Sequence, residues 1–148
     1  MTYDERIDWV KRKWPGASAE QAESLVFHSS YIVFDRAEEF LFRQGDAPCG
    51  FYWILSGSVR QFVGDQTLMH LDTGDMVGLE EFLQFRLHLF NWQSLTPVKA
   101  LFMDRRCFEM VVGTINDHHF IYNQLSRQLL DLKARYHHMN TDHFSPTG

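Results

Sequence analysis

The residues best suited to chemistry are eight histidines, two cysteines and the adjacent acids Glu80 and Glu81. A divalent metal needs three or four ligands that converge on one point. His70 and His88 stand alone in the sequence, while His118-His119 and His137-His138 are adjacent pairs whose side chains would diverge by about 100° on a helix. The sequence therefore predicts no metal site.

Signatures of catalysis are also missing from the sequence. It contains no Gly-x-Ser-x-Gly nucleophile turn and no phosphate-cradling P-loop. Cys49 and Cys107 are too few and too scattered for a disulfide framework or an iron–sulfur cluster. Glu80 and Glu81 could supply acid–base chemistry, but adjacent acids at a helix start usually stabilise the helix dipole. We therefore expect a protein that is not an enzyme.

Regularly spaced turn signals indicate the elements that position these residues. The dipeptides Gly45-Asp46, Ser56-Gly57, Gly64-Asp65 and Gly74-Asp75 recur at a spacing of about ten residues. Residues 51–55, between the first two, are aromatic or aliphatic and uncharged, which is typical of a strand buried on both faces. The pattern predicts a mainly β fold with flanking helices, built on a small antiparallel jelly-roll barrel.

Helix signals flank the predicted barrel. A helix from Asp4 to Trp14 is stopped by Pro15-Gly16, and Ser18 with Gln21 forms a capping box for a second helix. We expect one domain of 148 residues in four segments: N-terminal helices at 1–30, a β-barrel at 31–103, C-terminal helices at 104–139 and a tail at 140–148. The side chains expected to fill the barrel are Phe40, Phe42, Phe51, Trp53, Phe62, Leu68, Leu71, Val77 and Phe102.

Three motifs resemble the cyclic-nucleotide-binding sensor domains of catabolite-activator and Fnr-like transcriptional regulators. They are Gly45-Asp46, the run Tyr52-Trp-Ile-Leu-Ser-Gly-Ser-Val59, and Gly74-Asp-Met-Val-Gly78, in the order and at roughly the spacing of that family. Residues 104–108 resemble its closing strand and helix start, so the resemblance covers about residues 20 to 139. It implies a cupin-like double-stranded antiparallel β-helix with a long C-terminal helix.

The resemblance also implies a ligand site in residues 78–90, which we call the cassette. In the family, a Gly-Glu pair opens a short helix that meets ribose and phosphate, and an Arg followed by a hydroxyl residue and Ala completes an anion clasp. Here Leu79 stands at the acid position unless a one-residue shift lets Glu80 serve, and His88 stands at the Arg position, two residues after Arg86. The implied ligand-binding residues are Gly78, Leu79, Glu80, Glu81, Arg86, His88 and Leu89.

Three occupants of the barrel therefore stay open: a cyclic nucleotide such as cAMP, a different small ligand, or the protein's own side chains. The last two are favoured by the bulky residues of the cassette and the next strand, Phe82, Phe85, Leu87, Leu89, Phe90 and Trp92. A sensor needs a cavity beside Gly78 that Arg86 or His88 faces. Filling of that space by Phe85, Phe90 or Trp92 would contradict a sensor. No other cofactor is predicted.

The C-terminal helix carries an apolar stripe with nearly coiled-coil spacing. Its members are Ile121, Leu125, Leu129, Leu132, Tyr136 and Met139. The family resemblance places a dimerisation helix here, which implies a homodimer; a monomer could instead bury the stripe on its own barrel.

Charge and hydropathy limit the partners. With 14 Lys and Arg against 19 Asp and Glu, the net charge is −5 and no basic stripe is visible, so we expect no direct nucleic-acid binding. No apolar run approaches the length of a membrane span, and residues 1–5 do not resemble a signal peptide, which predicts a cytoplasmic protein. The family's transcription factors continue into a helix-turn-helix, whereas this sequence ends about ten residues after the long helix.

We therefore predict a non-catalytic ligand-sensing regulatory domain that acts through its dimer interface or on a partner protein. The alternative is a closed-barrel module for dimerisation or protein interaction that binds no ligand.

Overall fold

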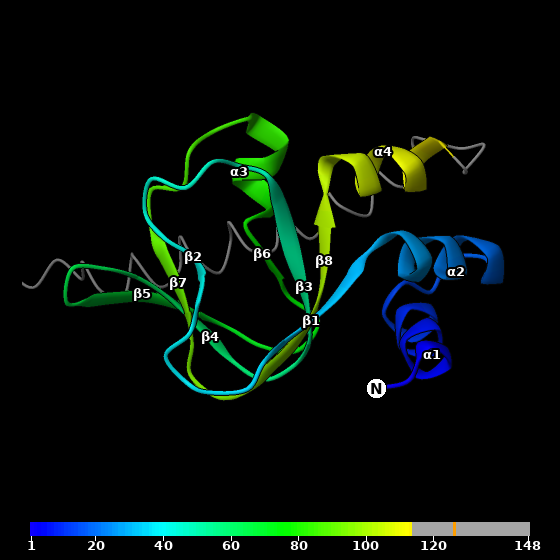
Figure 1. Ribbon diagram of the computed structural model, residues 1–148, viewed down its shortest axis with the longest axis horizontal. Coiled ribbons are helices and arrows are strands. Elements are labelled where there is room, and N and C mark those ends of the chain that lie inside the picture. The colour runs from blue at the N-terminus through cyan, green and yellow to red at the C-terminus, as the bar shows by residue number, and fades with distance from the viewer. Residues whose placement is uncertain (114–125, 127–148) are drawn as a thin grey trace, which may run out of the picture.

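The computed structural model describes residues 1–113 and Ser126. Figure 1 shows a β-rich body with α1, α2 and α4 gathered beside it. The elements in chain order are α1 (Tyr3–Lys13), α2 (Ala19–His28), β1 (Ser30–Phe34), β2 (Phe40–Phe42), β3 (Gly50–Ser56), β4 (Val59–Val63), β5 (Gln66–Leu71), β6 (Met76–Val77), α3 (Leu79–Gln84), β7 (Asn91–Ser94), β8 (Val98–Asp104) and α4 (Arg105–Gly113).

The strands form two four-stranded antiparallel sheets. One has the order β1-β8-β3-β6 and the other β2-β7-β4-β5. Side chains from both sheets meet in a shared apolar cluster that includes Phe42 and Trp92 from one sheet and Ile54 and Ala100 from the other. The protein is thus mainly antiparallel β with a few helices, in a two-layer, jelly-roll-like arrangement.

The predicted jelly-roll barrel is confirmed only in part, because no described strand pairs with both sheets and the sheets therefore do not close into a barrel. The edge strands β2 and β6 are only three and two residues long. Such short edges cannot carry a hydrogen-bond ladder from one sheet to the next. The long C-terminal helix predicted to reach about residue 138, with its stripe Ile121, Leu125, Leu129, Leu132 and Tyr136, lies outside the described residues.

Strand β3 is buried on both faces, which confirms the interpretation of its uncharged sequence. Phe51 and Trp53 point into a cluster shared with the helices, whereas Ile54 points into the cluster between the sheets. The period of two in a strand explains this division, since successive side chains face opposite sides. The central strand therefore connects the two apolar cores of the protein.

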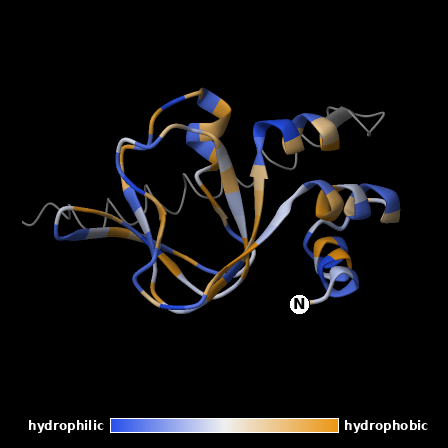
Figure 2. Ribbon diagram, viewed as in Figure 1, coloured by the Kyte–Doolittle hydropathy of each residue, from blue (hydrophilic) through white to orange (hydrophobic). Residues whose placement is uncertain are grey.

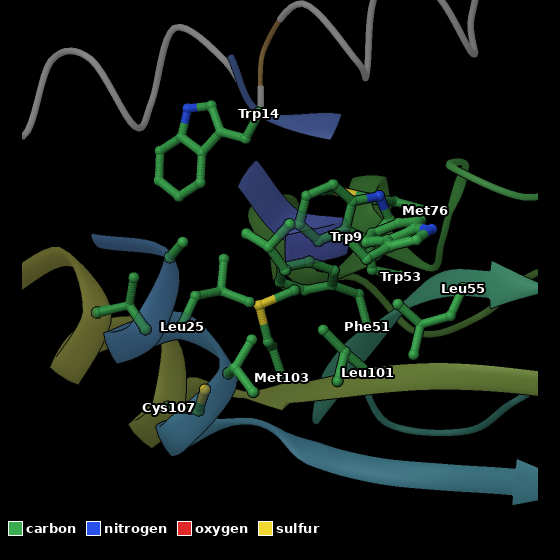
Figure 3. Packing of buried hydrophobic residues seen from close by; sticks show 14 of the residues in the cluster. Trp9, Trp14, Leu25, Phe51, Trp53, Leu55, Met76, Leu101, Met103 and Cys107 are labelled. Atoms are coloured by element: carbon green, nitrogen blue, oxygen red, sulfur yellow. The ribbon is translucent and has the colours of Figure 1, made fainter. Parts of the chain in front are cut away.

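The helices cover the outer face of the sheet β1-β8-β3-β6. The predicted capping box joins Ser18 and Gln21 at the start of α2. Trp9 of α1 meets Trp53 edge-to-face, with ring centroids 4.9 Å apart, and Figure 3 shows both rings beside Met76, with Leu25, Met103 and Cys107 nearby. Figure 2 shows hydrophilic and hydrophobic residues alternating around these helices, as expected for elements with one buried face.

The predicted filling of the interior needs one correction. Phe42, Phe51, Trp53, Leu71 and Val77 are buried as expected, and Phe102 packs against the core between the sheets. Phe40, Phe62 and Leu68 are only partly buried and belong to neither cluster. Strand alternation explains this difference: Gln61 takes the inward position next to Phe62.

Within the described part of the chain, no helix combines the length and apolar character that crossing a bilayer requires.

Candidate functional site

The cassette begins at Gly78, a position that only glycine can occupy without strain. Gly78 caps the N-terminus of α3 in the left-handed region, with φ +84°. A Cβ at this position would lie 2.6 Å from a ring carbon of Phe42 and 3.1 Å from Cε1 of His88. The glycine therefore allows the cassette to pack directly against β2.

His88 is the side chain by which the loop after α3 packs against the second sheet. Its imidazole stacks on the Phe42 ring with centroids 4.0 Å apart and planes inclined by 19°, and only 1% of the residue is exposed. Two backbone hydrogen bonds hold it there: the His88 N–H donates to the Asp46 carbonyl at 3.0 Å, and the Gly45 N–H donates to the His88 carbonyl at 2.7 Å.

The burial of His88 decides its charge. Burial lowers the pKa of its imidazole, and the charge of Asp46 only partly opposes this shift. The imidazole is therefore neutral near pH 7, so one of its nitrogens can donate a hydrogen bond and the other can accept one. Neither Nδ1 nor Nε2 has a hydrogen-bond partner among the described residues. His88 thus offers two unused hydrogen-bonding atoms but no positive charge.

Arg86, the other candidate for an anion clasp, lies on the surface. Its side chain is 42% exposed and pairs with Glu80 at 3.2 Å. Burial raises the pKa of Glu81, and Glu80 adds to the rise, while a backbone hydrogen bond and Arg86 oppose it. The first turn of α3 therefore carries acids and a surface ion pair.

The structure brings together only part of the predicted site. Gly78 and His88 meet against Phe42, and Leu79 is buried in the core beneath the helices. Leu89 and Phe85 point outward and are exposed. Since Phe85 is 72% exposed, it does not fill the space beside Gly78.

Three residues at the site escaped the sequence analysis as ligand candidates: Phe42, Gln61 and Trp92. In the register of the second sheet, Phe42 pairs with Trp92, and Trp92 pairs with Gln61. Gln61 Oε1 and Trp92 Nε1 are buried without a hydrogen-bond partner among the described residues. The only signal in the sequence was Gln61, a polar residue at an inward position of β4. Which residues lie beside Gln61 depends on the register between distant strands, which the sequence does not reveal.

The cassette is also joined to α4. The Phe82 ring lies 5.3 Å from that of Phe108, and Nη2 of Arg105 donates to the Phe82 carbonyl at 3.0 Å. The Arg105 guanidinium also lies 3.8 Å from the ring centroid of Phe85. These three contacts join the cassette to the first turns of α4.

Among the described residues, the other reactive side chains do not form a metal site. In residues 1–113, no three His, Cys, Asp or Glu side chains are grouped to hold a metal ion. Burial, with a smaller contribution from Asp104, raises the pKa of Cys107 to about 12, so its thiol stays protonated.

The fold and the cassette together consist of two antiparallel sheets, a glycine-capped short helix, and a loop that returns a polar side chain against the second sheet. The sequence profile of the cyclic nucleotide-binding domain matches residues 34–114. This protein belongs to the cyclic nucleotide-binding domain family.

Solved structures share this fold. A putative cyclic nucleotide-binding protein from Geobacter metallireducens is 17% identical with a TM-score of 0.71, and the match covers 91% of this chain and 98% of that one. A cyclic nucleotide-binding-like protein from Brucella abortus is 23% identical with a TM-score of 0.62, covering 74% and 99%.

A kinase subunit also has this fold. The regulatory subunit of a cAMP-independent protein kinase A from Trypanosoma cruzi, bound to guanosine, is 20% identical with a TM-score of 0.66; the match covers 84% of this chain and 50% of that one. No curated protein matches the chain.

Proposed function

We propose that the protein is a non-catalytic sensor domain that binds a small molecule between the cassette and the sheet β2-β7-β4-β5. The observation that carries the proposal is His88, a buried imidazole whose two nitrogens lack partners among the described residues and which lies against Gly78 and Phe42. Buried polar groups are normally hydrogen-bonded, so an unpaired one calls for a physical explanation such as a missing binding partner. Membership of the cyclic nucleotide-binding family supports the same location.

The ligand proposed here need not be a cyclic nucleotide. An anion clasp needs a cation at the phosphate, but the cassette presents a neutral imidazole and directs Arg86 to the surface. The Trypanosoma cruzi neighbour, described as cAMP-independent and bound to guanosine, is a precedent for this fold with a ligand other than a cyclic nucleotide.

The proposed response passes from the cassette to the C-terminal segment. Phe82 contacts Phe108, and Arg105 binds the Phe82 carbonyl, so movement of α3 would shift α4. In this proposal, the apolar stripe at Ile121, Leu125, Leu129, Leu132 and Tyr136 then pairs with a second copy, and the dimer interface or a partner protein reads the ligand state.

Thermal unfolding of the full chain tests this function with a panel of cyclic mononucleotides, cyclic dinucleotides, nucleotides, nucleosides and small apolar acids. A ligand at a hundred times its dissociation constant adds about 2.7 kcal/mol, which raises the melting temperature by roughly 5–10 °C. We expect at least one member to give such a shift in the wild type and a smaller shift in His88→Phe. A panel without any shift would contradict the sensor function.

A second candidate is the interaction module without a ligand, and two observations favour it. The cassette packs so closely on Phe42 that a methyl group at Gly78 would overlap the ring. Phe85, Leu87 and Leu89 together expose apolar surface around the cassette, and exposed apolar side chains that cluster commonly mark protein interfaces. The flat panel described above would select this candidate.

A further inference from the structure

A row of side chains crosses the inner face of the sheet β2-β7-β4-β5. Phe42 pairs with Trp92, Trp92 with Gln61, and Gln61 with Met69. Residues directly opposite each other in antiparallel strands point to the same face, and all four are buried. The row places a polar amide and an indole N–H beside the aromatic ring on which His88 stacks.

Several polar atoms of this row and of the neighbouring His88 lack hydrogen-bond partners among the described residues. Gln61 is 5% exposed, Trp92 4% and His88 1%, yet Gln61 Oε1, Trp92 Nε1 and both His88 nitrogens lack hydrogen-bond partners among the described residues. Nearly every buried polar group in a folded protein is paired, because an unpaired one loses its hydration without compensation. Unpaired polar atoms gathered from β4, β7 and the loop after α3 indicate a place where a ligand could supply the missing hydrogen bonds.

The charges around the row oppose an anion. Burial lowers the pKa of His88 and keeps the imidazole neutral, while the nearby negative charge of Asp46 opposes that shift only in part. Arg86 pairs with Glu80 on the surface, while Arg60 binds Gln93 and Thr67, at positions that alternate with the buried row. Charged groups near the row are therefore negative or engaged elsewhere.

The set of donors and acceptors narrows the ligand further. Trp92 donates, Gln61 Oε1 accepts, and neutral His88 does both. An oxyanion only accepts, so it would leave Gln61 Oε1 and one His88 nitrogen unpaired. Adjacent strands lie about 4.8 Å apart, so the row from Phe42 to Gln61 spans roughly 10 Å. A flat heterocycle with an attached sugar carries both donors and acceptors over such a length.

We propose that the site recognises an uncharged purine nucleoside through Gln61, Trp92 and His88, and discriminates against its cyclic phosphate. This rests on the ligand-sensing function proposed above. Because the unpaired atoms are covered, the nucleoside reaches them when the loop that carries His88 moves from the sheet. That loop is held to the turn at Gly45 and Asp46 by two backbone hydrogen bonds.

Calorimetric titration of the full chain with adenosine, guanosine, cyclic AMP and cyclic GMP tests the proposal. We expect one nucleoside to bind at least tenfold more tightly than its own cyclic phosphate. Equal or tighter binding of the cyclic phosphate would overturn the proposal while leaving the sensor function intact. Absence of binding by both nucleosides would overturn it too, and the wider panel would then decide separately whether the sensor function stands.

Two matched variants test the row itself. Gln61→Met replaces the unpaired amide with an apolar side chain of similar length, so it should raise the melting temperature by about 2–5 °C and weaken nucleoside binding roughly 10–100-fold. Gln93→Met removes a glutamine on the adjacent strand that binds Arg60 and the Glu38 carbonyl, so it should lower the melting temperature and leave the affinity unchanged. Unchanged nucleoside affinity in Gln61→Met would overturn the assignment.

Discussion

Replacing Gly78 with alanine tests how closely the cassette packs on the sheet. The added Cβ would meet the Phe42 ring at 2.6 Å and His88 at 3.1 Å, at a residue whose φ is +84°. The left-handed backbone costs a non-glycine residue about 1–2 kcal/mol, and overpacking a core costs about 1–3 kcal/mol. We therefore expect Gly78→Ala to lose about 2–5 kcal/mol of unfolding free energy.

Gly45→Ala is the matched control. Gly45 has a similar φ of +92°, but no atom of the described residues lies within 4 Å of the position of its Cβ. Only the backbone term applies there, about 1–2 kcal/mol, and alanine keeps the N–H that donates to the His88 carbonyl. The difference between the two variants therefore isolates the contact of the cassette with Phe42 and His88.

Urea unfolding followed by circular dichroism measures both losses, with thermal melting as a second readout. Each kcal/mol corresponds to roughly 2–4 °C in a domain of this size, so a loss of about 2–5 kcal/mol should make Gly78→Ala melt roughly 4–20 °C below the wild type. Equal losses in the two variants would refute the close packing of Gly78 on Phe42.

Three further predictions concern charge, assembly and a helix cap. Burial lowers the pKa of His88 in the folded protein, so the neutral imidazole contributes stability that is fully present above the unfolded pKa of about 6.5. This stability is lost as the pH falls through the lower pKa of the folded state, by at most about 1.4 kcal/mol per pH unit. His88→Phe should flatten this part of the profile in unfolding titrations, and an unchanged profile would show that His88 is not buried neutral. Leu132→Glu should give a monomer in analytical ultracentrifugation if the predicted stripe pairs two copies; an unchanged mass would reject that stripe. Ser18→Ala should lose about 1 kcal/mol, because Ser18 Oγ accepts the Gln21 N–H at 3.1 Å, and an unchanged urea midpoint would contradict this capping role.

Local signals predicted much of the fold. The capping box at Ser18 and Gln21, and the strand buried on both faces at 51–55, are each encoded within a few residues. The turn spacing predicted antiparallel strands, but it could not decide whether the two sheets close into a barrel. Closure depends on the lengths of the edge strands β2 and β6, which are set by contacts between distant segments.

The candidate site was less accessible to sequence reasoning. The family resemblance located the cassette, but the choice between Arg86 and His88 depends on the path of the loop after α3. Phe85 takes a left-handed conformation with φ +52°, and the chain then leaves Arg86 on the surface and turns His88 inward. Gln61 and Trp92 meet only through strand register across about thirty residues of sequence.

The most direct test of the proposed ligand site is a nitrogen–proton NMR spectrum of the four tryptophan indole N–H groups, recorded with and without adenosine or guanosine. Trp92 lies in the cluster between the sheets, whereas Trp9, Trp14 and Trp53 lie in the cluster beneath the helices. The Trp92 signal is assigned by its loss in Trp92→Phe. We expect one nucleoside to shift the Trp92 signal most strongly. Unchanged spectra with both nucleosides, or shifts confined to the other three tryptophans, would contradict the proposed site.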